Sequence, residues 1–258
     1  MTLSLWDRGL HYGDGVFRTF PLRHGKIPFF ERQLQKLQDD CQSLAMTPPE
    51  LNLLKAKVLG AIEQLDNAAI KIIVTRGNGQ RGYAPSVSQG PNIFVLTSTL
   101  TDYAAKWRQG ISLRLCQLRL SRQPKLAGIK HLNRLEQVLA RAEWHDPSID
   151  EGLLLDENEH VIEGVMSNLF VWDGQQLITP PLDHCGVKGL IRDLLLETLP
   201  KLGLVVKVEP VPLERIKKAH AILMTNSLWG VMPVRQFELG RYADFTIANI
   251  CHEALASI

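Results

Sequence analysis

One lysine lies in an unusually apolar stretch of the sequence and could act as a nucleophile. Lys130 directly follows Leu126-Ala127-Gly128-Ile129 and precedes Asn133, where a helix is expected to begin. Loss of water favours the neutral form of a lysine amine, and a neutral amine attacks carbonyl compounds. A lone lysine, however, more often extends its amine to the surface along its apolar stem. The spacing alone leaves both interpretations open.

A glycine-rich loop is a second candidate site. Gly77-Asn78-Gly79-Gln80-Arg81-Gly82 fits the GxGxxG pattern of dinucleotide-binding folds and follows an expected strand. That pattern requires a helix directly after the loop, and Tyr83-Ala84-Pro85 does not begin one. We therefore expect a hairpin loop. Arg76 and Arg81 are then candidates for holding an anionic ligand, while a solvated loop arginine is nearly as good an interpretation of Arg81.

A third candidate is the start of a helix that follows the Pro- and Gly-rich segment Pro180–Gly189. The run Gly189-Leu190-Ile191-Arg192-Asp193 is expected to open this helix. The first N–H groups of a helix have no partner inside it and can bind phosphate. Because every helix has such a terminus, this signal is weak by itself.

The composition is that of an ordinary globular protein. The chain has 258 residues, of which 45% are hydrophobic and 22% charged, and its net charge is +2. A balance this close to neutral does not indicate a nucleic-acid partner. No apolar run is long enough to span a bilayer, and the first residues do not resemble a signal peptide. The four cysteines are widely separated, so we expect no disulfide framework, no metal site and a cytoplasmic location.

Apolar patterns predict strands and helices that interleave along the chain. The expected strands are Val16–Pro21, Ala69–Thr75, Asn92–Thr97, Ile111–Leu120, Gly152–Leu155, Asn168–Trp172, Gln176–Ile178, Val205–Val208 and Ala221–Met224. The expected helices are Phe30–Leu44, Pro48–Leu65, Asn133–Trp144, Gly189–Leu199 and the tail from Tyr242. In the expected helix Asn133–Trp144, one face is lined by Leu135, Val138, Leu139 and Ala142.

These elements predict an α/β (α+β) protein with two domains. We expect an N-terminal domain at residues 1–103, a polar interdomain linker at 104–109, and a C-terminal domain at 110–258 that contains Lys130. The two strands on either side of the glycine-rich loop are expected to pair as a hairpin.

Five segments resemble, in the same order, the fold type IV pyridoxal-phosphate enzymes. That family includes branched-chain aminotransferases, D-amino acid aminotransferases and aminodeoxychorismate lyases. The segments are RGLHYGDGVFRTF (Arg8–Phe20), GIKHLNRLEQVLAR (Gly128–Arg141), EGLLLDENEHVIEGVMSNLFVW (Glu151–Trp172), GVKGLIRDLLLE (Gly186–Glu197) and MTNSLWGVMPV (Met224–Val234). An ordered set of five is far more specific than any one motif. The resemblance implies the two-domain fold of that family.

The resemblance also implies the residues that bind the cofactor, pyridoxal 5'-phosphate. Lys130 matches the catalytic lysine that carries the cofactor, and Glu163 matches the carboxylate at its pyridine nitrogen. The N–H groups of Leu190 and Ile191 match the phosphate site, with the Ser227 hydroxyl nearby.

One position departs from the family pattern. The family usually pairs the phosphate with an arginine on the first helix, where this chain has Lys36. Lysine keeps the charge but loses the bidentate fork. Arg32, one helical turn earlier, is the alternative partner.

Two segments favour the lyase branch: TRGNGQRGY (Thr75–Tyr83) and LAGIKHLNRLEQ (Leu126–Gln137) resemble aminodeoxychorismate lyases. The implied reaction converts 4-amino-4-deoxychorismate to 4-aminobenzoate and pyruvate, a step of folate synthesis. A branched-chain or D-amino acid aminotransferase is the first alternative, and a non-catalytic protein that binds the cofactor is the second. The family is homodimeric, so we expect a homodimer.

The implied substrate carries two carboxylates. Arg76 and Arg81 are candidates for binding them, and Lys71 is a further candidate, since some aminotransferases have arginine there. Tyr12 and Phe17 match residues that line the family's pocket.

Overall fold

The chain forms two compact units. The computed structural model describes residues 3–85 and 90–258. Unit 1 comprises Met1–Thr101 and Ile129–Arg134, and unit 2 comprises Asp102–Gly128 and Leu135–Ile258. The first break lies close to the predicted boundary at residue 103. Lys130, however, groups with unit 1, whereas the sequence-based division places it in the C-terminal domain.

Unit 1 is built on a three-stranded antiparallel sheet. Its strands are β1 (Gly15–Leu22), β2 (Ala68–Thr75) and β3 (Asn92–Ser98), in the order β1-β2-β3. All three predicted strands and the predicted hairpin are therefore confirmed. Because side chains alternate along a strand, Val16 and Val74, which pair across β1 and β2, share the buried face with Phe20. Phe17 and Lys71 lie on the opposite face.

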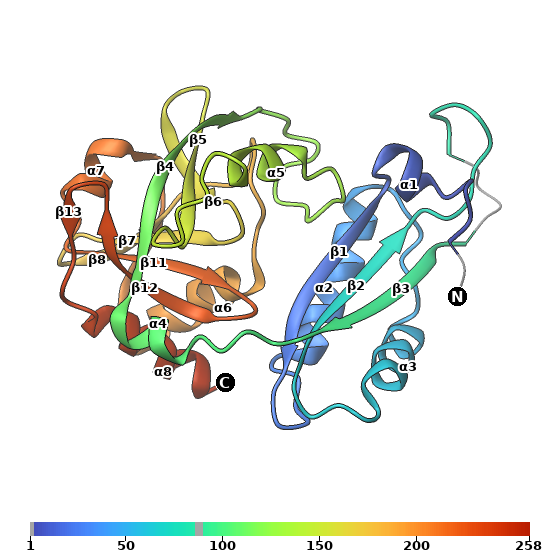
Figure 1. The fold of residues 1–258 in the computed structure, drawn as a ribbon, viewed down its shortest axis with the longest axis horizontal. Helices are drawn as coiled ribbons and strands as arrows, with labels where there is room; N and C mark the ends of the chain where they lie inside the picture. Colours follow the sequence, from blue (N-terminus) through green and yellow to red (C-terminus); the bar gives the residue numbers. More distant parts are fainter. Residues whose placement is uncertain (1–2, 86–89) are drawn as a thin grey trace. The chain divides into compact units, whose positions relative to one another are not determined.

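Helices cover the buried face of this sheet. α2 (Phe30–Ser43) packs on β1 and α3 (Leu51–Ile62) on β3 (Figure 1). The predicted helix Phe30–Leu44 is confirmed, and its Leu34, Leu37 and Cys41 are fully buried. A short helix, α1 (Arg8–Tyr12), precedes β1; the sequence patterns did not indicate it.

Unit 2 contains a larger sheet of ten strands. The path of nine paired strands runs β10-β6-β5-β4-β12-β11-β7-β8-β9, and β13 pairs with β12. The strands are β4 (Ile111–Leu120), β5 (Glu151–Asp156), β6 (His160–Gly164), β7 (Asn168–Trp172), β8 (Gln176–Thr179), β9 (Val205–Val208), β10 (Val211–Pro212), β11 (Ala221–Asn226), β12 (Gly230–Phe237) and β13 (Gly240–Arg241).

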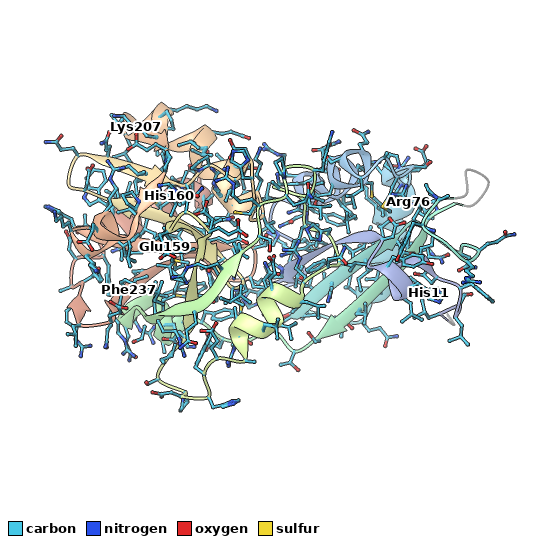
Figure 2. All side chains as sticks on the ribbon, turned by 90° about the horizontal axis from the view of Figure 1, so that it is seen from above. His11, Arg76, Glu159, His160, Lys207 and Phe237 are labelled. Carbon is cyan, nitrogen blue, oxygen red and sulfur yellow. The ribbon has the colours of Figure 1, made fainter. Side chains whose placement is uncertain are left out.

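An additional pairing closes part of this sheet on itself. β6 also pairs with β7, so the strands β6-β5-β4-β12-β11-β7 form a closed ring. The pairing that closes the ring is Glu163 with Asn168. The core beside the ring includes Phe237 at the end of β12, which is 1% exposed and is labelled in Figure 2.

The helices of unit 2 differ from prediction at residues 104–109, at Asn133–Trp144 and at Leu213–Lys217, where no helix was predicted. They are α4 (Ala104–Gln109), α5 (Leu135–Arg141), α6 (Leu190–Thr198), the 3-10 helix Leu199–Leu202, α7 (Leu213–Lys217) and α8 (Thr246–Ala256). The residues expected to form a linker, 104–109, are the helix α4. Its Trp107 donates a hydrogen bond from Nε1 to the Trp229 carbonyl at 2.8 Å, so this segment packs as part of unit 2.

The apolar face predicted for the helix Asn133–Trp144 is largely exposed on α5. Leu135, Val138 and Leu139 are 75%, 60% and 61% exposed, and Ala140 is the buried residue of this helix. The helix is also shorter than predicted. In the part of the chain that the structure describes, no helix is both long and apolar enough to cross a membrane.

Candidate active site

The backbone of Lys130 is held at both of its polar groups. Its carbonyl accepts a hydrogen bond from the Phe17 N–H at 3.0 Å, and Leu132 N–H donates to the Gly15 carbonyl at 2.9 Å. The segment that carries Lys130 therefore lies along β1. The Lys130 N–H donates to Asp40 Oδ2 on α2 at 3.4 Å. These contacts fix where the lysine side chain starts.

Asp40 is part of a buried ion pair. Arg18 on β1 contacts Asp40 Oδ2, and the two residues are 3% and 5% exposed. Burial raises the pKa of Asp40, while the nearby charges of Arg18 and Lys36 oppose that rise. The Arg18 Nε atom is buried without a hydrogen-bond partner among the described residues. One carboxylate thus ties β1, α2 and the backbone of Lys130 together.

The Lys130 amine lies against an aromatic ring. Its Nζ atom is 4.6 Å from the ring centroid of Phe17, and the Nζ atom of Lys71 is 4.8 Å from the same centroid. Both distances are within the range of cation–π attraction. Unit 1 therefore gathers Lys130, Lys71 and Phe17, three of the residues singled out by sequence.

The other candidate residues of unit 1 have contacts or exposure that differ from those of Lys130, Lys71 and Phe17. The Tyr12 ring packs against Tyr83 at 5.3 Å between centroids. Arg81 is exposed on the loop after β2, and Arg32 is exposed on α2. Lys36 is half-buried and its charge acts on Asp40. Lys36 thus acts electrostatically on Asp40, the carboxylate that accepts the Lys130 N–H.

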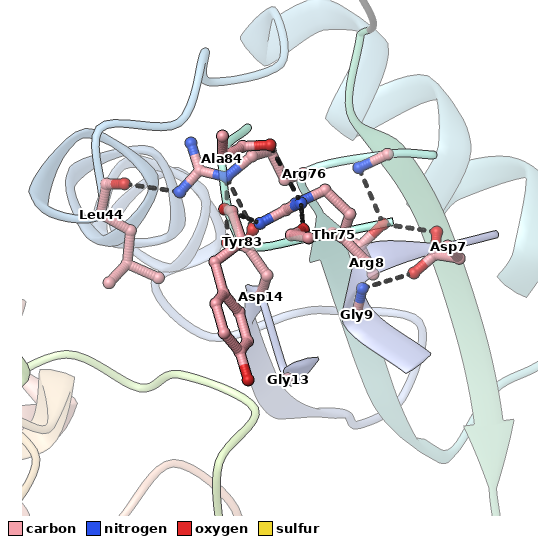
Figure 3. A network of polar contacts seen from close by, with 12 residues as sticks. Asp7, Arg8, Gly9, Gly13, Asp14, Leu44, Thr75, Arg76, Tyr83 and Ala84 are labelled. Atoms are coloured by element: carbon pink, nitrogen blue, oxygen red, sulfur yellow. Dashed lines mark hydrogen bonds and ion pairs between the residues drawn. The ribbon is translucent and has the colours of Figure 1, made fainter. Parts of the chain in front are cut away.

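The geometry of Arg76 argues against a substrate-binding role. Its Nε donates to Asp14 and its NH2 group to the Leu44 carbonyl, each at 2.8 Å (Figure 3). Its NH1 group donates to the Ala45 carbonyl at 2.8 Å. Arg8 donates to the same Asp14 carboxylate at 2.8 Å. Burial would raise the pKa of Asp14, but its bonds to the two arginines outweigh burial and lower it. Arg76 thus fastens the end of α2 to β2.

Unit 2 holds a buried carboxylate in a fixed orientation. Glu163 on β6 is 4% exposed. Its Oε2 atom accepts hydrogen bonds from the Val187 N–H at 2.8 Å and from Asn168 Nδ2 at 3.3 Å. Two donors on one oxygen set the plane of the carboxylate, so Glu163 can present a rigid negative charge.

Asn168 joins Glu163 to the start of α6. Its Nδ2 also donates to the Val187 carbonyl at 2.8 Å, and its Oδ1 accepts from the Gly189 N–H at 3.1 Å. Gly189 is the N-cap of α6, and no side chain caps this helix. The free end of α6, which begins with Leu190 and Ile191, is therefore suited to an anion.

A buried hydroxyl lies beside Asn168. Thr225 on β11 pairs directly with Asn168 on β7, so their side chains share one face of the sheet. Thr225 is 1% exposed, and its Oγ1 has no hydrogen-bond partner in the described residues. Ser227 follows shortly after, at the turn from β11 to β12. A fixed carboxylate, an uncapped helix and an unsatisfied hydroxyl fit a ligand with a basic ring nitrogen and a phosphate.

The family model for amino-transferase class IV matches residues 15–237. The chain belongs to the class IV aminotransferase family. It is 35% identical over 233 residues to the aminodeoxychorismate lyase of Vibrio harveyi, covering 90% of this chain and 86% of that protein. It is 28% identical to a putative branched-chain-amino-acid aminotransferase of Methanocaldococcus jannaschii, covering 92% and 83%.

A solved structure from the same family is similar in sequence and fold. The 4-amino-4-deoxychorismate lyase of Pseudomonas aeruginosa superposes with a TM-score of 0.93 at 40% identity, covering all of this chain and 95% of that one. The branched-chain aminotransferase of Escherichia coli, at 20% identity and a TM-score of 0.85, shares the fold. The predicted α/β, fold type IV architecture is confirmed.

Two buried polar residues of this class IV aminotransferase family member were missed by the sequence reasoning. One is Asn168; its position at the start of an apolar strand, five residues after Glu163, was the available signal. The other is Glu151, which is fully buried and accepts hydrogen bonds from Ser167 Oγ at 2.8 Å and the Gly152 N–H at 2.9 Å. Burial raises the pKa of Glu151 to about 7. The importance of Asn168 and Glu151 is seen only from their hydrogen-bond partners in the structure.

Proposed function

We propose that this protein is an aminodeoxychorismate lyase, which converts 4-amino-4-deoxychorismate to 4-aminobenzoate and pyruvate with pyridoxal 5'-phosphate as cofactor. One observation carries the proposal. The identity to two lyases, 35% and 40%, extends over 90% or more of the chain and exceeds the 28% identity to the aminotransferase. The reaction places the protein in folate synthesis.

The residues present fit the cofactor. Lys130 is the attachment point, and the rigid carboxylate of Glu163 is the partner of the ring nitrogen. The phosphate is assigned to the N–H groups of Leu190 and Ile191 and to the Ser227 hydroxyl. The uncapped start of α6 supports that assignment. Lys36 supplies a positive charge for the phosphate in preference to the exposed Arg32.

The bound cofactor supplies an electron sink for the bond-breaking step. The negative charge of Glu163 keeps a proton on the ring nitrogen, which that sink requires. The Lys130 amine, once it no longer holds the cofactor, removes the proton from the amine-bearing carbon of the substrate. It then delivers a proton to the enolpyruvyl methylene, which becomes the methyl group of pyruvate.

The substrate carboxylates are assigned to Lys71 and Arg81. Lys71 contacts the same Phe17 ring as Lys130, so a substrate at Lys130 lies within reach of the Lys71 charge. Arg81 lies exposed on the loop after β2, where its charge is accessible to an anionic ligand. Phe17 and Tyr12 are the aromatic residues of the proposed pocket.

Two further assignments belong to this proposal. The protein is a homodimer, because the exposed apolar residues Leu135, Val138 and Leu139 of α5 need a cover. It is cytoplasmic, because its four cysteines are all free and buried, as is usual in a reducing compartment.

An assay of the purified protein with its cofactor tests the proposal. We expect formation of 4-aminobenzoate and pyruvate in equal amounts, and loss of both in Lys130→Ala. Lys125→Ala removes an exposed lysine of the same segment and is the matched control, with unchanged rates expected. Efficient transfer of an amino group to a keto acid, with no 4-aminobenzoate formed, would contradict the proposal.

A further inference from the structure

Asn168 contacts both ends of the proposed cofactor site. Its Nδ2 lies 3.3 Å from Glu163 Oε2, and its Oδ1 accepts the Gly189 N–H at 3.1 Å. The residue is 5% exposed. A single rigid amide therefore links the carboxylate assigned to the ring nitrogen with the N-cap of the helix assigned to the phosphate.

The loop between these two ends is held by the same amide. Nδ2 donates to the Val187 carbonyl at 2.8 Å, and Val187 N–H donates to Glu163 Oε2 at 2.8 Å. Asn168, Val187 and Glu163 thus form a closed set of hydrogen bonds. Moving any one of the three disturbs the other two.

Gly189 shows how closely Asn168 approaches the start of α6. A Cβ atom added to Gly189 would overlap Asn168 Oδ1. The backbone of Gly189 has φ −72° and ψ 146°, a conformation open to any residue. Glycine is therefore needed at this position for the close approach of Asn168, and not for its backbone angles.

We propose that Asn168 is a positioning residue that couples the carboxylate of Glu163 to the N-terminus of α6, so that the ring and the phosphate of one ligand are held at a fixed separation. The proposal rests on the assignment of Glu163 to the ring nitrogen. Residues that hydrogen-bond to a ligand-binding group change affinity 10–100-fold in metal sites, and we expect a comparable effect at this site.

The test measures whether the two ends bind independently. Apo-protein is titrated with pyridoxal phosphate and with pyridoxal, which lacks the phosphate, and both dissociation constants are determined by equilibrium dialysis. Their ratio gives the contribution of the phosphate. This ratio is the dissociation constant for pyridoxal divided by that for pyridoxal phosphate. When Glu163→Gln is the only substitution, we expect the ratio to fall about fivefold or more, as for residues in one hydrogen-bond network.

Asn168 variants then locate the coupling. In Asn168→Ala we expect weaker binding of pyridoxal phosphate, by about 10-fold or more, and no further change of the ratio when Glu163→Gln is added. Asn168→Asp keeps the acceptor for Gly189 but loses the donor to Glu163, so it too should abolish the coupling. Gly189→Ala should do the same, although it alters neither Asn168 nor Glu163.

The outcomes separate the two proposals. If Glu163→Gln leaves binding of both ligands unchanged, the assignment of Glu163 is wrong and the coupling falls with it. If Glu163→Gln weakens both ligands by the same factor in the wild type, the coupling alone is wrong. This comparison needs no Asn168 variant, so it stands even if those variants fold poorly. If Asn168→Ala and Gly189→Ala lower only the melting temperature, Asn168 has a purely structural role.

Discussion

The guanidinium of Arg76, a candidate from the sequence for substrate binding, is hydrogen-bonded to neighbouring groups of the fold. It donates to the carbonyls of Leu44 and Ala45 just after α2, and to Asp14, which also accepts from Arg8. Removing one partner of such part-buried polar groups costs about 1–3 kcal/mol.

We expect Arg76→Met to lower the free energy of unfolding by about 1–3 kcal/mol and to leave the KM for 4-amino-4-deoxychorismate nearly unchanged. Urea unfolding and steady-state kinetics measure the two effects. Arg81→Met, at the exposed loop, is the comparison and should show the reverse pattern. A large rise in KM for Arg76→Met with full stability would restore Arg76 to the substrate site.

Glu151 gives the protein a specific dependence of stability on pH. Its pKa is about 7 in the folded protein, against 4.5 for an ordinary glutamate. The folded state therefore binds more protons than the unfolded state between these values. By linkage, the contribution of Glu151 to stability is greatest below pH 4.5 and declines as the pH rises toward 7.

Comparison with Glu151→Gln isolates this contribution, since the variant cannot titrate. Between pH 4.5 and 8, the stability of the wild type relative to the variant should fall by up to about 3 kcal/mol. Thermal or urea unfolding across this range measures it. A difference that stays constant with pH would mean that Glu151 titrates normally.

At the scale of elements, the Arg18–Asp40 pair joins β1 and α2 to the segment that carries Lys130. Breaking a buried pair leaves a charge without a partner, so Asp40→Leu alone should cost about 3–5 kcal/mol. Replacing both residues, Arg18→Met with Asp40→Leu, removes both charges and the unpartnered Arg18 Nε. Stability should then return to within about 1 kcal/mol of the wild type.

The double variant still lacks the acceptor for the Lys130 N–H, so its kcat should remain low after stability has returned. Unfolding curves and turnover measured on the same preparations separate the two effects. Recovery of kcat together with stability would show that the pair holds the elements together without positioning Lys130.

Strands and helices with a clear apolar pattern in their own residues could be predicted from the sequence. The elements that pack against them could not. The run Ala69–Thr75 is β-branched and apolar, so β2 could be identified without knowing its neighbours. The stripe on α5 was equally clear, but periodicity reports only that a face is apolar and not what covers it. The contacts of Arg76, Asn168 and Glu151 could not be predicted for the same reason, because most of their partners are distant in sequence.

At the scale of the whole molecule, the exposed face of α5 leads to a prediction about assembly. A charge on that face should disrupt an apolar interface between two copies of the chain. We expect Leu139→Asp to convert the dimer to a monomer, as measured by sedimentation velocity at several concentrations. Leu239→Asp is the control, because Leu239 is 98% exposed and lies outside α5. A wild-type protein that sediments as a monomer at all concentrations contradicts the dimer.

At this scale the fold family could be predicted from the sequence. The division of the chain into its two units could be predicted only in part. Five ordered motifs indicated the fold type IV family, and the family match over residues 15–237 confirms it. The return of Ile129–Arg134 to unit 1 depends on hydrogen bonds with β1 and leaves no pattern in the sequence. The closed ring of strands likewise depends on the pairing of β6 with β7.

The closed ring of strands in unit 2 constrains the order in which the chain can fold during synthesis. The ring includes β12, which ends at Phe237, so all of its strands can pair only after residue 237 has been synthesised. The pairing of Glu163 with Asn168 belongs to this ring, and Glu163 is the residue that we propose for the ring nitrogen of the cofactor. We therefore expect stable binding of the cofactor only after β12 has joined the ring, late in folding.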